Sequence, residues 1–256
     1  PWQKLKEFTD ARIALGRTGC SLPTDEWLGF SLAHARARDS ISMPFDRDKI
    51  ARQLEAIDMD VVYAESCVSS RAAFVRRPDL GRHLSDESRT NLEQMNYKGA
   101  DVLIVIGDGL SSKAVHKQAV PLIREFLPYM HELGMSVGPV VLAKESRVAL
   151  GDDIAEEMHC GLVAMLIGER PGLSSPDSLG VYMTYKPFAG RLESERNCIS
   201  NIRPEGLSYE RAAFKLAWRV EMAYERNISG TALKDCSDNP DCYHSLKPHR
   251  AHLLAV

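Results

Sequence analysis

Two loops of the sequence place a carboxylate directly after a run of apolar residues, where it could bind a ligand. The first is Gly107-Asp108-Gly109-Leu110-Ser111-Ser112, and the second is Gly168-Glu169-Arg170-Pro171-Gly172-Leu173-Ser174-Ser175. Small residues let the backbone approach a ligand closely, and a carboxylate accepts hydrogen bonds from the ligand. The first loop fits a binding loop and a tight strand-to-helix turn capped by Ser111 equally well. The second is long and combines Glu169 with Arg170, which favours a binding role.

Two further patterns match known cofactor motifs only in part. Gly107-x-Gly109-x-x-Ser112 is one glycine short of a dinucleotide fingerprint. The acidic residue that this fingerprint requires about 20 positions later is missing, because Glu145 lies too far along. A nicotinamide or flavin site is therefore disfavoured. Tyr129-x-His131-x-x-Gly134 has tyrosine where the cobalt-ligating D-x-H-x-x-G motif has aspartate. It closes an expected helix, for which a histidine and a glycine are ordinary C-terminal residues.

The cysteine and histidine residues point to neither a metal site nor a nucleophile. Five of them crowd the C-terminal end, namely Cys236, Cys242, His244, His249 and His252. Their spacing matches no zinc-ligand pattern, so a solvated tail is favoured. Cys198 has no His–Asp partner pattern and is expected to be a buried small hydrophobic residue. The sequence thus predicts no metal ligand and no catalytic residue in this chain.

Composition narrows the class of protein. The chain has 256 residues, a net charge of −3, 44% hydrophobic and 26% charged residues, as in ordinary globular proteins. The weak net charge argues against a nucleic-acid partner. No apolar run reaches the ~18–20 residues of a membrane span, so no membrane partner is expected. Irregularly spaced cysteines and the lack of a signal peptide indicate free thiols in a cytoplasmic protein.

The elements that must position these loops change in character along the chain. Residues 1–95 are expected to form a helical N-terminal region, with helices starting near Thr24, Asp46 and Ser85. After Gly99, short apolar runs alternate with amphipathic stretches. The runs cover 101–107, 137–143, 162–167 and 181–185, and the stretches cover 113–126, 152–158 and the residues after Ser208. This alternation predicts an α/β protein with a Rossmann-like, doubly wound, mostly parallel sheet in residues 96–230. Residues 231–256 are expected to form a loose polar tail.

Five ordered sequence blocks, taken together, are more specific than any single motif. They cover residues 8–19, 76–82, 108–111, 168–173 and 197–202. With these blocks in this order, the chain resembles the small (light) subunit of ethanolamine ammonia-lyase. The tail after Asp235 does not share the resemblance.

The resemblance implies a subunit that helps to bind adenosylcobalamin at the junction with a large catalytic barrel subunit. That large subunit would bind ethanolamine, and the complex would convert it to acetaldehyde and ammonia by radical chemistry that the cofactor supplies. The chain would thus belong to a carbon–nitrogen lyase and be inactive without its large partner. The resemblance also implies cofactor contacts at Val148, Glu169 and Cys198. It further implies a bacterial cytoplasmic location, often inside a protein-shelled microcompartment.

The positions of these three residues agree with a shared site. Val148 follows the second expected strand of residues 96–230, Glu169 follows the third, and Cys198 precedes the last helix, so all could line one crevice. Two other functions stay open, a nucleotide-dependent Rossmann oxidoreductase and a non-catalytic assembly protein. Apolar residues beside N-terminal turns predict contact with a partner protein. These residues are Trp2, Leu5, Phe8 and Leu22.

Overall fold

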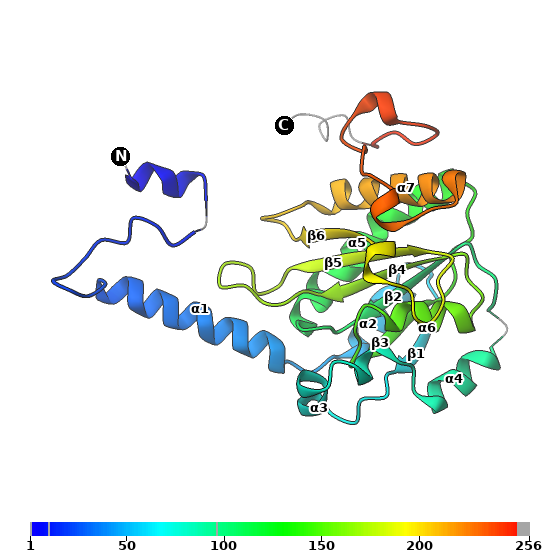
Figure 1. Ribbon diagram of the computed structural model, residues 1–256, viewed down its shortest axis with the longest axis horizontal. Helices are drawn as coiled ribbons and strands as arrows, with labels where there is room; N and C mark the ends of the chain where they lie inside the picture. The colour runs from blue at the N-terminus through cyan, green and yellow to red at the C-terminus, as the bar shows by residue number, and fades with distance from the viewer. Residues whose placement is uncertain (1, 10, 96, 250–256) are drawn as a thin grey trace.

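A computed structural model describes residues 2–9, 11–95 and 97–249. In these ranges, six strands form one sheet in the order β1-β3-β2-β4-β5-β6 (Figure 1). The strands are β1 (Val61–Glu65), β2 (Val102–Gly107), β3 (Val140–Lys144), β4 (Leu162–Gly168), β5 (Leu179–Tyr185) and β6 (Asn197–Ile202). The α-helices are α1 (Thr24–Ser42), α2 (Arg47–Glu55), α3 (Arg71–Arg76), α4 (Asp86–Glu93), α5 (Ser112–Glu132), α6 (Leu150–Glu157) and α7 (Tyr209–Arg226). The 3-10 helices are η1 (Trp2–Glu7), η2 (Leu80–Arg82), η3 (Glu193–Glu195), η4 (Gly230–Ala232) and η5 (Pro240–Cys242). None of the helices described combines the length and the apolar character needed to cross a bilayer.

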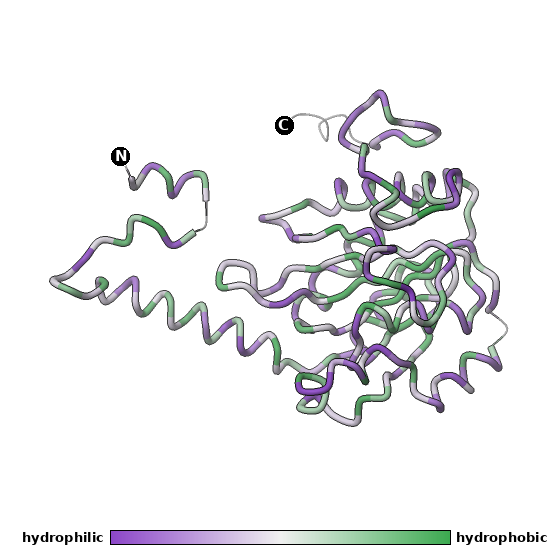
Figure 2. The backbone as a smooth tube through the Cα atoms, viewed as in Figure 1, coloured by the Kyte–Doolittle hydropathy of each residue, from purple (hydrophilic) through white to green (hydrophobic). Residues whose placement is uncertain are grey.

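The sheet lies between two layers of helices, which confirms the α/β class. One face packs against α2, α5 and α7, where Ile104, Phe126 and Trp218 are buried together. The other face packs against α4 and α6, where Leu103 and Ile154 are buried. Figure 2 shows hydrophobic residues concentrated in the strands between these layers. Every residue of β2 and β4 is buried, because a strand covered on both faces requires apolar side chains on both sides.

The sheet is mixed. Strands β1, β3, β2 and β4 pair in parallel, whereas β5 is antiparallel to both of its neighbours, β4 and β6. The antiparallel edge has a simple cause. A parallel pair needs a crossover connection, usually a helix, and no helix lies between β4 and β5 in the described chain. The chain therefore turns back directly, and the apolar run at 181–185 becomes part of an antiparallel strand.

Neither edge strand is predicted by the sequence patterns. β1 lies inside the region expected to be helices and loops, and it pairs with β3 along its whole length. Its side chains alternate between buried and exposed, so it has no continuous apolar run. β6 is the polar segment around Cys198, with only Ile199 and Ile202 buried. Edge strands tolerate polar residues because one side of the strand faces solvent.

Most of the expected helix starts are confirmed. The side chains of Asp46, Ser85, Ser111 and Ser208 each accept a hydrogen bond from a backbone N–H in the first turn of the following helix. The start expected near Thr24 is also confirmed, although without a capping side chain. Thr24 is the first residue of α1, Pro23 precedes it, and no side chain caps that end.

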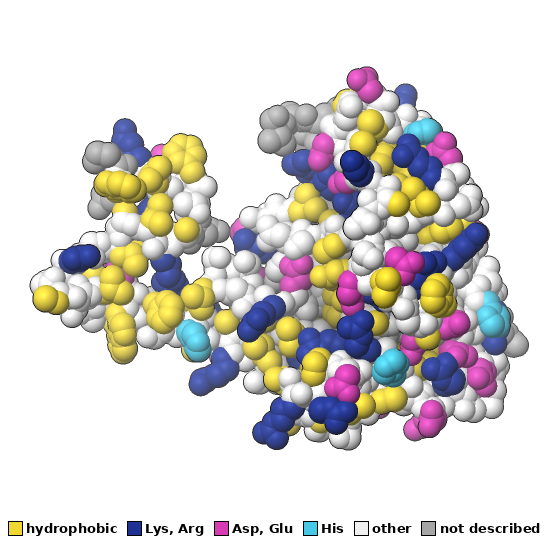
Figure 3. All heavy atoms as spheres, in the orientation of Figure 1, with side chains coloured by type: hydrophobic (Ala, Val, Ile, Leu, Met, Phe, Trp, Pro, Cys, Tyr) yellow, Lys and Arg dark blue, Asp and Glu magenta, His cyan; other side chains and the backbone are white. Residues whose placement is uncertain are grey.

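Residues 2–9 and 11–42, here called the arm, extend from the body of the molecule. The C-terminal end of α1 meets the body of the molecule, and the helix projects away from it (Figure 1). The chain before α1 folds back along the outer part of this helix. Large apolar side chains gather on the arm (Figure 3), where Phe8 is 82% exposed and Trp27 is 58% exposed. The N-terminal apolar residues singled out in the sequence are all exposed.

The expectation of a loose C-terminal tail is wrong for residues 231–249. Leu233 and Leu246 are buried in the main core. The Trp218 indole of α7 donates a hydrogen bond to the Cys242 carbonyl at 2.9 Å. The Asp235 carboxylate pairs with Arg219 at 2.8 Å. The polar composition of this segment wrongly suggests that it is loose. A few apolar side chains and ion pairs are enough to hold it to α7. The expected tail residues 250–256 lie outside the described residues.

Candidate functional site

A cavity of about 390 Å³ lies at the carboxyl ends of β2 and β4, beside the antiparallel strands β5 and β6. Ligands of open α/β sheets bind at this edge. Loops after β2, β3 and β4 and side chains of β5 and β6 form its walls. The residues that line it include Leu110, Arg147, Val148, Glu169, Tyr182 and Ser200.

Glu169 follows β4 and is held by residues of the antiparallel edge. Its Oε2 accepts hydrogen bonds from the Ser178 hydroxyl and from the Asn201 N–H at 3.3 Å. Its Oε1 accepts a hydrogen bond from the Ser200 hydroxyl at 2.5 Å. The carboxylate thus joins the start of β5 to the middle of β6. Since a carboxylate offers about four acceptor positions, it can still accept a bond from a ligand.

Val148 and Glu169 line the same cavity, and Cys198 lies beside it. Val148 is half-buried and packs on the core under α6. Cys198 is opposite Tyr182 in the antiparallel pair of β5 and β6, so their side chains lie on the same face. Tyr182 lines the cavity. Cys198 is exposed, so the expectation that it is buried is wrong. Partial loss of hydration still raises the pKa of its thiol, the Tyr182 hydroxyl lowers it, and the net effect is a raised pKa. A raised pKa leaves the thiol neutral, which disfavours a role as nucleophile.

The loop after β2 is a tight turn that forms one wall of the cavity. Gly109 has φ +52°, and a Cβ there would lie 2.4 Å from the Gly168 carbonyl oxygen. The Leu110 N–H donates to the same oxygen at 3.0 Å. The space that the glycine leaves open is therefore filled by the loop after β4. Ser111 caps α5, as the turn interpretation predicts.

Asp108 of this turn points into the protein. It is 2% exposed and accepts hydrogen bonds from the Ser146 N–H at 3.0 Å and from Arg71 at 3.0 Å. Arg71 also pairs with Glu145 at 3.2 Å. Burial raises the pKa of Asp108 to about 6, against the lowering effects of Ser146 and Arg71. This network fixes the loop after β3, which carries Arg147 and Val148.

A second cavity of about 440 Å³ adjoins the first, because Arg147 and Val148 line both. Its other walls come from the chain around Asp79 and Arg82 and from Glu193. The sequence patterns do not single out Arg147, Tyr182 or Ser200. Arg147 directly precedes Val148 in the loop after β3, and this position is a signal that could find it. Tyr182 and Ser200 reach the site only because β5 and β6 form the antiparallel edge.

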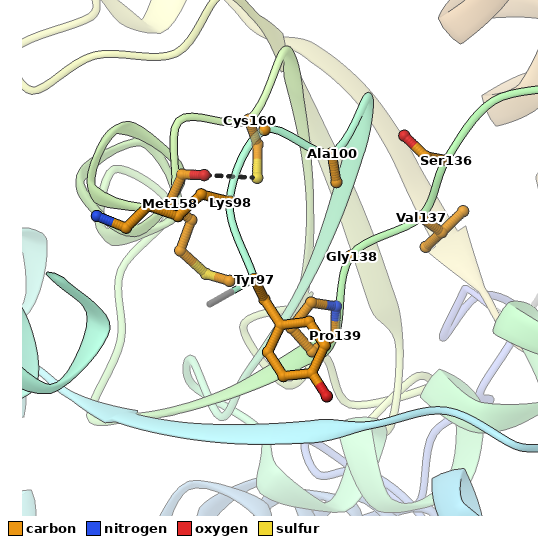
Figure 4. A pocket seen from close by; sticks show the side chains of 10 residues that line it. Tyr97, Lys98, Ala100, Ser136, Val137, Gly138, Pro139, Met158 and Cys160 are labelled. Atoms are coloured by element: carbon orange, nitrogen blue, oxygen red, sulfur yellow. Dashed lines mark hydrogen bonds between the residues drawn. The ribbon is translucent and has the colours of Figure 1, made fainter. Parts of the chain in front are cut away.

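A third cavity, of about 280 Å³, lies at the opposite end of the sheet, where β2, β3 and β4 begin. Figure 4 shows Tyr97, Lys98 and Cys160 among its walls, with the Cys160 thiol directed to the Met158 carbonyl oxygen at 3.5 Å. Burial raises the pKa of Cys160 to about 11. The thiol is therefore protonated and inert near neutral pH.

The two histidine residues that the structure describes near the C-terminus have individual partners. His249 stacks on Tyr129 with ring centroids 3.9 Å apart, and His244 lies 3.4 Å from a carboxylate oxygen of Glu225. In the described part of the chain, no three His, Cys, Asp or Glu residues are grouped so that they could hold a metal ion. His252 lies outside the described residues.

Fold and cavity together define an α/β protein with a polar cavity at the carboxyl edge of a mixed sheet. The family model "Ethanolamine ammonia-lyase light chain (EutC)" matches residues 1–234. The ethanolamine ammonia-lyase small subunit of Pseudomonas fluorescens (strain SBW25) is 46% identical over 251 residues, which cover 94% of this chain and 91% of the relative. That of Rhodopseudomonas palustris (strain BisA53) is 48% identical over 233 residues, covering 91% and 89%.

The chain belongs to the ethanolamine ammonia-lyase light-chain family. It is therefore related to the subunits of a carbon–nitrogen lyase, and the resemblance noted in the sequence is confirmed. The word "small" in the names of the relatives implies a larger partner subunit.

Proposed function

We propose that this chain helps to bind adenosylcobalamin in the cavity at the carboxyl edge of its sheet, together with a large catalytic subunit that binds ethanolamine. One observation carries the proposal. Val148 and Glu169 line one cavity, and Cys198 lies beside Tyr182 of the same cavity. The family resemblance implies cofactor contacts at these three positions, which come from three separate segments of the chain.

The donor set of the cavity fits this cofactor. The corrin ring carries amide side chains, which both donate and accept hydrogen bonds. Glu169 can accept from an amide N–H, and the Ser200 hydroxyl, whose hydrogen is donated to Glu169, can accept from a second amide N–H. Val148 and Tyr182 offer apolar surface for the ring itself. When bound, the cofactor supplies the radical chemistry, and this chain contributes binding, orientation and exclusion of water.

The size of the cavity supports a shared site. Its volume of about 390 Å³ suits a drug-sized ligand. Cobalamin is several times heavier than such a ligand, so this cavity can enclose only one side of it. The remaining surface of the cofactor would be covered by the large subunit. A cavity of this size fits a cofactor at the junction of two subunits better than a self-sufficient oxidoreductase.

The test is a titration of the assembled complex with adenosylcobalamin, followed by equilibrium dialysis. Glu169→Gln replaces one acceptor oxygen with an amide. A hydrogen bond to a charged group contributes ~1.5–3 kcal/mol, so we expect the cofactor affinity to fall by about ten- to a hundredfold.

Ser178→Ala is the matched control. The Ser178 hydroxyl donates to the same carboxylate from a buried position that does not line the cavity. Its loss should lower the melting temperature and leave the cofactor affinity nearly intact. If Glu169→Gln behaves like Ser178→Ala, with a lowered melting temperature and an unchanged affinity, Glu169 serves only to hold β5 and β6 together. The cofactor role that we assign to it would then be wrong.

A further inference from the structure

Arg147 lies on the wall between the two adjoining cavities at the carboxyl edge. It lines both the cavity of about 390 Å³ and the cavity of about 440 Å³. The residue is half-buried, and its backbone N–H donates to the Gly81 carbonyl at 2.8 Å. Its guanidinium stacks on the ring of Phe74, with the carbon 4.3 Å from the ring centroid. Phe74 is fully buried, so the orientation of the guanidinium is fixed before any ligand binds.

The charge of Arg147 has no carboxylate partner in the described part of the chain. Its Nη2 reaches only the Phe74 carbonyl at 3.5 Å, and its Nε is buried without a hydrogen bond to any described residue. The neighbouring arginines differ in this respect. They pair as Arg71 with Asp108 at 3.0 Å, Arg82 with Glu193 at 2.7 Å and Arg196 with Asp152 at 2.5 Å. A partly buried cation without a counter-charge is costly, because burial removes part of its hydration.

The surroundings of Arg147 are those of an anion site. Burial lowers the pKa of its guanidinium, and the positive charge of Arg71 lowers it further, while Asp108 raises it. An anion in either cavity would restore a stable environment for this charge. Arg170 also lines the first cavity, but it is exposed, so water solvates its charge. The unbalanced charge therefore belongs to Arg147.

We propose that Arg147 binds the phosphodiester of the cofactor's nucleotide loop. This inference rests on the proposed function. The side chains of the corrin ring are neutral amides, so the phosphodiester is the one anionic group on the periphery of cobalamin. A planar guanidinium with a fixed orientation binds phosphate oxygens through two parallel N–H bonds, which a lysine cannot reproduce. The nucleotide loop would lie where the two cavities meet, and the ring would face Glu169 and Tyr182.

The first experiment compares two cofactors on the assembled complex by equilibrium dialysis. Adenosylcobinamide lacks the nucleotide and its phosphodiester. We expect Arg147→Gln to weaken adenosylcobalamin binding by about ten- to a hundredfold and to leave adenosylcobinamide binding unchanged. Arg147→Lys, which keeps the charge and loses the two-bond geometry, should lie between the two. Arg124→Gln removes the same charge from an exposed position on α5 and should change neither affinity.

The second experiment observes the phosphodiester directly by phosphorus NMR of the bound cofactor. The resonance should shift on binding to the unmodified complex and move back towards its free position in Arg147→Gln and Arg147→Lys. Equal resonances in all three complexes, or equal losses of affinity for both cofactors, would overturn the proposal. If the unmodified complex does not bind adenosylcobalamin, the proposed function itself fails. If Glu169→Gln weakens binding and Arg147→Gln does not, only the inference about Arg147 fails.

Discussion

Asp108 is a buried carboxyl group whose protonation should make the stability of the protein depend on pH. Burial raises its pKa to about 6 in the folded chain, whereas the ordinary value is 3.8. Between these two values the folded state holds a proton that the unfolded state has released. The contribution of Asp108 to stability is therefore complete below about pH 4 and decreases as the pH rises through 6.

The matched variant is Asp108→Asn, which cannot titrate. A difference of about two pKa units corresponds to about 3 kcal/mol. We expect the free energy of unfolding of the natural chain, minus that of Asp108→Asn, to fall by about this amount between pH 4 and pH 7. Urea unfolding at intervals of one pH unit measures it. A difference that rises with pH would mean that Arg71 keeps Asp108 ionised throughout.

Gly109 should be far less tolerant of substitution than another glycine with a similar backbone. Gly109→Ala adds the strain of a positive φ, about 1–2 kcal/mol, to a clash with the Gly168 carbonyl that costs about 1–3 kcal/mol more. Gly134 has φ +65° and no atom within 4 Å of its missing Cβ, so Gly134→Ala carries only the first cost. Urea unfolding of both variants should show the larger loss at Gly109. Equal losses would contradict the close contact of the two loops.

The position of residues after strands predicts part of the site. Glu169 and Val148 follow buried strands, and both line the cavity. Asp108 occupies an equivalent position but faces inward, because Arg71 and Ser146 bind its carboxylate. The direction of a side chain in a turn depends on partners more than 30 residues away. A sequence pattern that spans only the turn cannot contain that information.

At the scale of elements, the arm should become protected when the partner subunit binds. Its side chains, among them Trp27 and Phe8, are exposed apolar groups of the kind that form interfaces. We expect backbone hydrogen exchange in peptides that cover the arm to slow on assembly with the large subunit. Peptides from α5, which is packed between the sheet and other elements, provide the control. Unchanged exchange in the arm would remove it from the interface.

Strands buried on both faces are the elements best predicted from sequence. β2, β4 and much of β3 coincide with apolar runs, because helices cover both sides of these strands. The edge strands β1 and β6 cannot be predicted from apolar runs, since about half of their side chains face solvent. The direction of β5 cannot be predicted from its apolar run either, because the run would be the same in a parallel and in an antiparallel strand. Only the absence of a helix between residues 169 and 178 distinguishes a hairpin from a crossover.

For the molecule as a whole, the purified chain should not convert ethanolamine when supplied with adenosylcobalamin alone. The sequence offers no nucleophile–base or acid–base pair for the substrate, and the cavity at the carboxyl edge is too small to enclose the cofactor. Acetaldehyde should form once the large subunit is added. The measurement is an acetaldehyde assay on the chain, on the large subunit and on their mixture. Acetaldehyde from the chain without its partner would contradict the assignment of catalysis to the large subunit.

The anchored segment after α7 has a consequence for biosynthesis. The family match ends at residue 234, yet Leu246 and the Cys242 carbonyl complete the packing around Trp218. A ribosome makes α7 before it makes this segment. Until the segment emerges, the outer side of α7 has no cover, and newly made chains could associate through it. Residues 231–249, which follow α7 in synthesis, are thus expected to cover a surface through which nascent chains would otherwise associate.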